Sequence, residues 1–289
     1  RTQIGSILLV AVMLLSLLPA GTLAATTTFS DIQNHWGKNA IERWSSYGIV
    51  SGTGDGIFSP DADITRAEMA QIYVNLLHLT EKADISNFTD VAANAWYADA
   101  VAKCVAAGIF SGTSATTFSP AAPITREQMF VTFGHVLGLS PVDTTKATFT
   151  DLPQVSDWAK GMVYAMLEAG YISGVGDNML MPLIPINRAS VMVLMDAVVT
   201  GYGNKAGAIV DVTGKNSLVL VVSGDVTITG QMGDVIITQG AANGTVTLDD
   251  ATVTGTVTFS SPTTRLRLMG DTNVENLIVG TDATDAVVS

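Results

Sequence analysis

Two different spacings of apolar residues divide this chain. Up to about residue 200 the apolar residues recur every three to four positions, as Ile41, Trp44 and Tyr47 do, which is the spacing of one face of a helix. After Gly203 apolar and polar residues alternate one by one, which is typical of strands. The pattern therefore predicts a helical part followed by an all-β part.

The helical part consists of one unit that is repeated three times. Each copy has a Phe-x-Asp, a tryptophan, a first helix, a glycine turn and a second helix that begins at an arginine. The second helices start within Ile64–Glu68 (ITRAE), Ile124–Gln128 (ITREQ) and Ile186–Ser190 (INRAS), and their arginines lie 60 and 62 residues apart. A period of this length predicts one structural unit used several times.

The start of each second helix carries a capping signal. Thr65 with Glu68, and Thr125 with Gln128, match the capping box, in which each side chain bonds the other's backbone amide. In the third copy Asn187 is still able to cap, but Ser190 replaces the glutamate, so half of the box is missing.

The arginine that follows each cap lies where a cation gains nothing from the helix dipole. We therefore interpret Arg66, Arg126 and Arg188 as functional, since helix amides together with a guanidinium would bind a carboxylate or phosphate. The alternative is an ion pair with Asp31, Asp90 or Asp151 of the same or a neighbouring repeat. Three copies of the same local conflict favour the functional reading.

Composition limits the partners and the compartment. The chain has 289 residues, with 26 acidic and 14 basic ones, which argues against a nucleic-acid partner. The apolar stretch Ile4–Leu18, followed by small residues up to Ala25, predicts a secretory signal peptide. A membrane anchor is the alternative, but about 15 residues is shorter than the roughly 20 needed. The single cysteine, Cys104, suits an exported bacterial or archaeal surface protein and predicts a buried thiol.

Taken together, Phe29–Val199 resembles three tandem S-layer homology modules. The resemblance rests on the joint spacing of the Phe-x-Asp, tryptophan, glycine-turn and capped-arginine motifs in all three copies. It implies an all-α, pseudo-threefold domain with a central three-helix bundle and grooves between neighbouring repeats. It further implies that these grooves bind pyruvylated secondary cell-wall polysaccharide, in which a ketal pyruvate places a carboxylate on a sugar.

The resemblance assigns roles to four sets of residues. Arginines would contact the pyruvate carboxylate, and turn glycines would let the backbone approach the sugar. Tryptophans would offer a flat face to a sugar ring, or else pack in the core. Aspartates would orient hydroxyls or arginines, or else form the turn before a helix. The sets are Arg66, Arg126 and Arg188; Gly52, Gly112 and Gly174; Trp36, Trp96 and Trp158; and Asp31, Asp90 and Asp151.

The third copy departs from the other two. Its cap is incomplete, and its loop Asp177–Ile186 is unusually apolar. Our hypothesis is that the three sites are unequal, with the one built on Arg188 the weakest or altered.

The all-β part has short apolar pairs at steps of 9 to 11 residues. They are Val226/Ile228, Val235/Ile237, Val246/Leu248, Val257/Phe259, Leu266/Leu268 and Leu277/Val279. This spacing predicts a β-helix or solenoid with two strands per coil, although a sandwich remains an alternative. Repeat arrays need caps, and no polar capping segment precedes Ser289, so we expect the natural protein to continue.

The predicted boundaries are 1–25 for an N-terminally incomplete signal peptide, 26–82, 83–142 and 143–202 for the three repeats, and 203–289 for the β-rich region. We expect a secreted, non-catalytic protein that attaches to the cell wall, needs no cofactor or metal, and leaves the membrane after signal cleavage. Assembly into a surface layer stays open. The alternative is a wall-anchored polysaccharide-processing enzyme, for which Asp249, Asp250, Asp271 and Glu275 would supply carboxylates.

Overall fold

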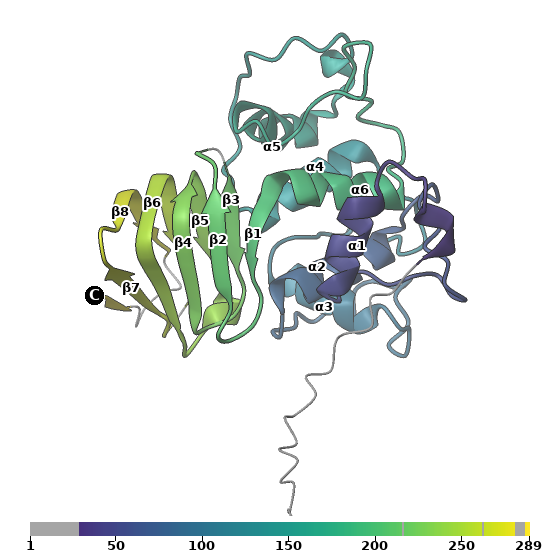
Figure 1. The fold of residues 1–289 in the computed structure, drawn as a ribbon. Coiled ribbons are helices and arrows are strands. Elements are labelled where there is room, and N and C mark those ends of the chain that lie inside the picture. The colour runs from purple at the N-terminus through teal and green to yellow at the C-terminus, as the bar shows by residue number, and fades with distance from the viewer. Residues whose placement is uncertain (1–28, 216, 262, 281–286) are drawn as a thin grey trace, which may run out of the picture.

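The computed structural model describes residues 29–215, 217–261, 263–280 and 287–289. A helical part and a parallel β-solenoid lie side by side, joined where α6 runs directly into β1 (Figure 1). The predicted signal peptide, 1–25, lies outside the described residues. Within the described ranges no helix is both long and apolar enough to cross a bilayer.

Six α-helices form the helical part, two from each repeat. They are α1 (Lys38–Ser46), α2 (Arg66–Leu77), α3 (Ala98–Ala106), α4 (Arg126–Val136), α5 (Asp157–Glu168) and α6 (Arg188–Val198), with short 3₁₀ turns at Ser30–Ile32 and Leu152–Gln154. Both predicted capping boxes are present, at Thr65 with Glu68 and at Thr125 with Gln128. Asn187 caps α6 alone, as its sequence predicted.

The three repeats close into a ring around three isoleucines. The backbone amide of Ile64 donates to the carbonyl of Ile186 at 3.1 Å, Ile124 donates to Ile64 at 2.9 Å, and Ile186 donates to Ile124 at 3.0 Å. All three side chains are buried. The ring explains the pseudo-threefold symmetry, because each repeat supplies one donor and one acceptor and the third closes on the first.

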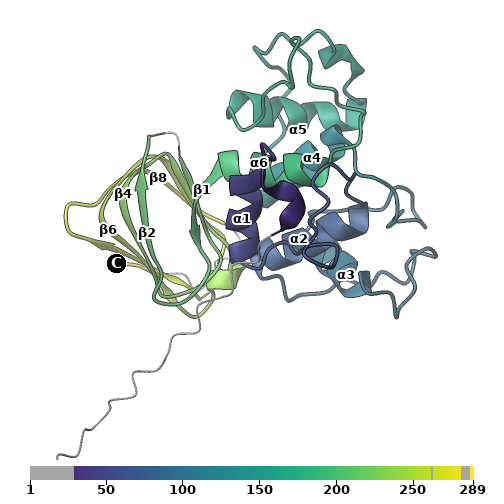
Figure 2. The same ribbon diagram turned by 45° about the vertical axis from the view of Figure 1, so that its right-hand side comes forward.

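Helices pack across the boundaries between repeats. α2 lies against α3, α4 against α5, and α6 returns to α1. Their apolar faces share one core, in which Trp44, Tyr73 and Phe133 are completely buried. Cys104 is buried in the same core, as its apolar surroundings predicted. The resulting helical cluster is seen beside the β-solenoid in Figure 2.

The β part is a solenoid of about four turns whose strands are all parallel. The strands are β1 (Val199–Gly203), β2 (Ile209–Thr213), β3 (Leu218–Val221), β4 (Val226–Met232), β5 (Asp234–Ile237), β6 (Thr245–Phe259), β7 (Arg265–Met269), β8 (Asn273–Val279) and β9 (Val287–Val288), with a 3₁₀ turn at Gln239–Ala241. A parallel array with an internal apolar core is what the short, evenly spaced apolar pairs predicted.

The solenoid register explains the spacing of the apolar pairs. Val226 lies beside Val246, which in turn lies beside Leu266, whereas Val235 stacks on Val257 and then on Leu277. Successive pairs along the chain therefore alternate between two faces of the coil. Two steps of 9 to 11 residues complete one turn, and the prediction of two strands per coil is confirmed.

The long strand β6 passes through both faces. Its first half pairs with β7 and its second half with β8. Between them Asp250 has a left-handed φ of 48°, a conformation that Asp tolerates better than most residues. The adjacent pair Asp249–Asp250 thus lies at a bend inside strand β6.

The hydrophobic core of the helical part extends onto the first strands of the solenoid, whose interior forms a second core. Tyr202 of β1 is buried against Trp44 and Tyr47, with ring centroids 5.6 and 5.0 Å apart. Its hydroxyl donates to the Leu76 carbonyl at 2.6 Å. Because strand β1 already begins at Val199, the β region starts four residues before the predicted boundary at 203, and the helical part covers its first coil.

Candidate functional site

A cavity of about 700 Å³ lies at the junction between the repeats. Its lining includes Arg66 from the first repeat, Gly112 from the second, and Trp158 from the third. We call this cavity the first groove. The first groove thus combines a predicted arginine, a predicted turn glycine and a predicted tryptophan, and each comes from a different repeat.

Arg66 is buried at the wall of the first groove. Its Nε donates to the Phe118 carbonyl at 2.8 Å and its Nη2 donates to the Ser111 carbonyl at 2.9 Å. The guanidinium also lies 4.7 Å from the centre of the Phe118 ring. Burial lowers the pKa of Arg66 to about 10, although the charge of Asp90 opposes the shift. The side chain is therefore still charged at neutral pH.

Arg188 repeats this geometry at the junction of the third repeat with the first. Its Nε donates to the Phe58 carbonyl at 2.9 Å and its Nη2 to the Ser51 carbonyl at 2.7 Å. Arg126 differs, because within the described residues its guanidinium makes one hydrogen bond, from Nε to the Leu180 carbonyl at 2.7 Å. It is also less buried than the other two arginines.

The threefold relation defines two further grooves. By this relation the residues equivalent to Arg66, the Gly112 turn and Trp158 are Arg126, the Gly174 turn and Trp36 at the second groove, and Arg188, the Gly52 turn and Trp96 at the third. The hydrogen bonds from Arg126 to Leu180 and from Arg188 to Ser51 agree with this assignment. The position of Trp36 follows from α1 packing on α6, where a Cβ on the neighbouring Gly37 would come within 3.2 Å of Ala189.

The apolar loop Asp177–Ile186 belongs to the second groove. Leu180, Pro182 and Ile184 accept hydrogen bonds from Arg126 and Glu127 at the start of α4. The hypothesis that this loop disturbs the site of Arg188 therefore fails on geometry, because Arg188 contacts the turn of the first repeat instead.

The helix amides do not face the grooves. At the start of α2, the amides of Arg66 and Ala67 donate to the carbonyls of Ala122 and Pro120 at 3.0 Å each. The amides at the start of α4 and α6 are bonded in the same way by the next loop in the ring. The predicted receptor of amides plus guanidinium is thus wrong for the amides, since backbone carbonyls already satisfy them.

The aspartates act on the turn that the arginine also holds. Asp90 accepts from the amides of Phe118 and Ser119 at 2.8 and 2.7 Å, while Arg66 binds the carbonyl of the same Phe118. Asp31 and Asp151 bind the equivalent amides in their own repeats. Among the described residues none of the three forms an ion pair with a groove arginine. Each aspartate therefore stabilises a turn 27 to 30 residues further along its own repeat, and not the turn just before a helix that was the sequence alternative.

The carboxylate of Asp90 should make the fold sensitive to acid. Burial favours the neutral acid, but the Phe118 and Ser119 amides outweigh it and hold the pKa of Asp90 below its ordinary value. A lowered pKa in the folded state contributes stability that is present above about pH 4 and is lost as the pH falls through the folded value. We expect Asp90→Asn to be less stable than the wild type at pH 7 and to lose less stability between pH 5 and pH 2.5. Urea unfolding at each pH measures both, and parallel curves would contradict the assignment.

The turn glycines are required by a close contact inside each repeat. A Cβ on Gly52 would lie 2.7 Å from the Phe29 ring, on Gly112 it would lie 2.6 Å from Phe88, and on Gly174 it would lie 2.7 Å from Phe149. Such distances are too short for any side chain. These glycines thus allow the turn to pack on the phenylalanine of the Phe-x-Asp motif. Of the three, Gly112 is the one that lines the first groove.

The three tryptophans are the most exposed part of the predicted site. Trp36, Trp96 and Trp158 have 63, 63 and 60% of their surface exposed, so the alternative of a core role is excluded. A large aromatic side chain held in solvent at the same place in all three repeats is suited to an external apolar partner such as a sugar face.

Sequence reasoning missed several groove residues. Gln128, Pro141 and Met162 also line the first groove. Gln128 carried a signal that was read only as a cap, although the side chain at this position varies among the repeats, with Glu68 and Ser190 as its equivalents. Pro141 and Met162 lie outside the repeated motifs and had no such signal.

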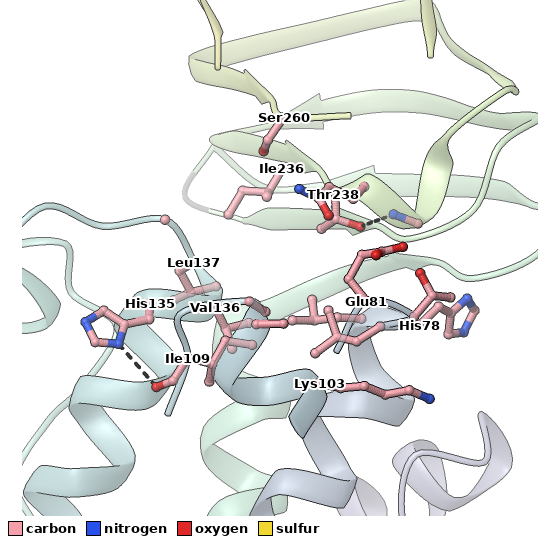
Figure 3. A pocket seen from close by; sticks show the side chains of 18 of the residues that line it. His78, Glu81, Lys103, Ile109, His135, Val136, Leu137, Ile236, Thr238 and Ser260 are labelled. Atoms are coloured by element: carbon pink, nitrogen blue, oxygen red, sulfur yellow. Dashed lines mark hydrogen bonds between the residues drawn. The ribbon is translucent and has the colours of Figure 1, made fainter. Parts of the chain in front are cut away.

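A second cavity of about 720 Å³ lies between the helical part and the solenoid (Figure 3). Ile236, Thr238 and Ser260 border it from the β side, while Lys103 and His135 border it from the helical side. The His135 ring is bonded to the Ile109 carbonyl at 3.3 Å. This cavity contains none of the predicted site residues.

Asp250 is the acidic residue of the solenoid whose contacts are clearest. Asp250 accepts from the Asp271 amide at 2.9 Å and so stabilises a corner. In the described part of the chain no three His, Cys, Asp or Glu residues are arranged to hold a metal ion.

Comparison with known proteins agrees with this geometry. The family model described as "S-layer homology domain" matches residues 28–70, 87–130 and 148–192. Each match covers one Phe-x-Asp, one exposed tryptophan, one glycine turn and one capped arginine. The match therefore falls on the three units that form the ring.

Relatives share this part of the chain alone. The Surface-layer 125 kDa protein of Lysinibacillus sphaericus is 34% identical over 176 residues, which is 60% of this chain and 15% of that protein. Exoglucanase XynX of Acetivibrio thermocellus is 33% identical over 59% of this chain and 16% of its own length. The Cellulosome-anchoring protein of the same organism is 30% identical over 48% of this chain and 33% of its own. The chain thus spans a third or less of these relatives. It belongs to the S-layer homology family, with three tandem domains over residues 28–192 followed by a β-solenoid over residues 199–279.

Proposed function

We propose that the helical part anchors this protein non-covalently to the cell wall by binding pyruvylated secondary cell-wall polysaccharide in the grooves between repeats. The observation that carries the proposal is the first groove, where a buried guanidinium and an exposed indole line one cavity. Arg66 uses Nε and Nη2 to hold the turn. Among the described residues its Nη1 has no hydrogen-bond partner, which leaves donors for a carboxylate.

The overall charge opposes a diffuse attraction to an anionic polymer. Between Phe29 and Val199 there are 17 acidic and nine basic residues. At physiological salt, charges are screened beyond about 8 Å, so a groove arginine at contact distance outweighs the more distant acids. Several weak sites on one polymer add avidity. Binding should therefore decline only modestly as salt rises.

The relatives support an anchoring role for the shared part. Their printed names include a surface-layer protein, a cellulosome-anchoring protein and an exoglucanase, and what these otherwise different proteins share with this chain is the helical repeats. A segment that proteins with such different names have in common is better explained by attachment to the cell wall than by catalysis of one particular reaction. We accordingly propose a non-catalytic role at the cell surface, with the solenoid as a spacer, display or lattice-forming region.

Retention by purified wall tests the proposal. Trp158→Ala should lower the affinity for native wall polysaccharide by about tenfold, because an aromatic face contributes on the order of 1 kcal/mol to a stacked contact. Its thermal midpoint should stay unchanged, since the side chain is 60% exposed. Ile209→Ala is a matched control, because Ile209 is 74% exposed on the solenoid.

Chemically depyruvylated wall supplies the second arm of this experiment. The wild type should bind it far more weakly than native wall. Equal retention on both walls would overturn the pyruvate contact, and equal binding by wild type and Trp158→Ala would overturn the groove.

A further inference from the structure

The three grooves differ in the side chain that faces the arginine across the junction. This side chain is the third residue of the second helix, and it is Glu68 in α2, Gln128 in α4 and Ser190 in α6. The first groove pairs Arg66 with Gln128, both of which line its cavity. The third groove pairs Arg188 with Glu68, whose Oε1 lies 3.7 Å from Nη1 of the arginine.

We infer that Glu68 acts as a built-in competitor for the anionic ligand in the third groove, so that ligand affinity in each groove is set by the charge at this helix position. The inference rests on the proposed function and names the residue that makes the ligand affinities of the three grooves differ. Nη1 of Arg188 is the nitrogen left over after Nε and Nη2 have bonded to Phe58 and Ser51. The Glu68 carboxylate occupies the direction from which a ligand carboxylate would approach.

Burial strengthens the competition. The side chain of Arg188 is 7% exposed and that of Glu68 is 33% exposed, so the pair is screened less than one at the open surface. Asp31 adds a second negative charge near Arg188, whereas Arg66 has Asp90 alone. A ligand carboxylate entering the third groove would therefore meet an arginine that is already neutralised, as well as a like charge.

Glu68 keeps this position because it also caps α2. Its Oε2 accepts from the amide and the hydroxyl of Thr65, both at 2.8 Å, which leaves Oε1 for the arginine. In the second repeat Gln128 performs the same capping with an uncharged amide, accepting from the Thr125 amide at 3.3 Å. The capping role and the charge are thus separable, and Glu68→Gln should fold.

The test is a reciprocal exchange in the full chain, with the variants Glu68→Gln and Gln128→Glu. The probe is a methyl hexopyranoside carrying a pyruvate ketal, and the same glycoside without pyruvate is the control. Each groove is monitored separately by the NMR signal of its arginine Nε–H, because these protons are held by the carbonyls of Phe118, Leu180 and Phe58. Thermal midpoints report whether each variant is folded.

We expect Glu68→Gln to tighten binding at Arg188 by about tenfold and Gln128→Glu to weaken binding at Arg66 by about tenfold, as expected for one charge at this distance in a partly screened site. Binding at Arg126 should change in neither variant. If the pyruvate probe binds at Arg66 but Glu68→Gln leaves the affinity at Arg188 within twofold of the wild type, this inference is overturned and the proposed function stands. If no arginine distinguishes the two glycosides, the proposed function fails and takes this inference with it.

Discussion

Replacing Tyr202 with alanine is expected to destabilise the protein by about 3–5 kcal/mol, as large-to-small changes of buried aromatic residues do. Tyr202 is 5% exposed and joins the first coil of the solenoid to Trp44 and Tyr47 of the helical part. The change also leaves the buried Leu76 carbonyl without its hydroxyl partner. The two parts should then unfold separately, because the core at their interface is interrupted.

The distribution of tryptophans makes this uncoupling measurable. All four tryptophans lie in the helical part, so their fluorescence reports that part alone, whereas far-UV circular dichroism also reports the strands. In urea the two signals should coincide for the wild type and separate for Tyr202→Ala. Tyr202→Phe removes only the hydroxyl bond and should cost about 1–2 kcal/mol with the signals still coincident. Coincident transitions in the alanine variant would show that Tyr202 is not needed to couple the two parts.

Replacing Arg66 with alanine is expected to destabilise the protein by about 2–4 kcal/mol, apart from any effect on binding. The change deprives the carbonyls of Phe118 and Ser111 of charged donors and leaves a cavity beside the Phe118 ring. Unsatisfied buried carbonyls and lost volume are the usual sources of such costs.

Arg126→Ala is the matched comparison. Arg126 makes one hydrogen bond through its guanidinium and is less buried, so its loss should cost about half as much. Urea unfolding measures both variants, and equal costs would contradict the structural difference between the two junctions. Because arginine variants change stability as well as the groove, Trp158→Ala is the cleaner probe of wall binding.

Much of the architecture follows from local sequence patterns. The capping boxes at Thr65 and Thr125 located the second helices because a cap involves residues only three positions apart. The apolar pairs of the solenoid predicted two strands per coil because inward-facing residues must alternate along every strand. For Trp158 the sequence left a core role open, and the structure shows it exposed at the first groove.

The grouping of site residues could not be read in this way. Arg66 shares a groove with Gly112 and Trp158, although the repeat pattern presents it with Gly52 and Trp36 of its own copy. Equivalent residues in three copies are indistinguishable by spacing, and only ring closure decides which copy supplies each wall. Ring closure also brings carbonyls of the next loop to the first amides of each second helix. These amides are therefore already hydrogen-bonded and do not form the predicted receptor.

The sequence by itself thus determined the repeated unit, its helix starts, its candidate arginines and tryptophans, and the coil of the solenoid, because each depends on contacts between residues close in the chain. The tertiary structure alone decided which repeats meet in each groove, that Glu68 faces Arg188, and that Tyr202 joins the two parts. The last two contacts join residues more than 100 positions apart, and packing in three dimensions, rather than local periodicity, selects all of these neighbours.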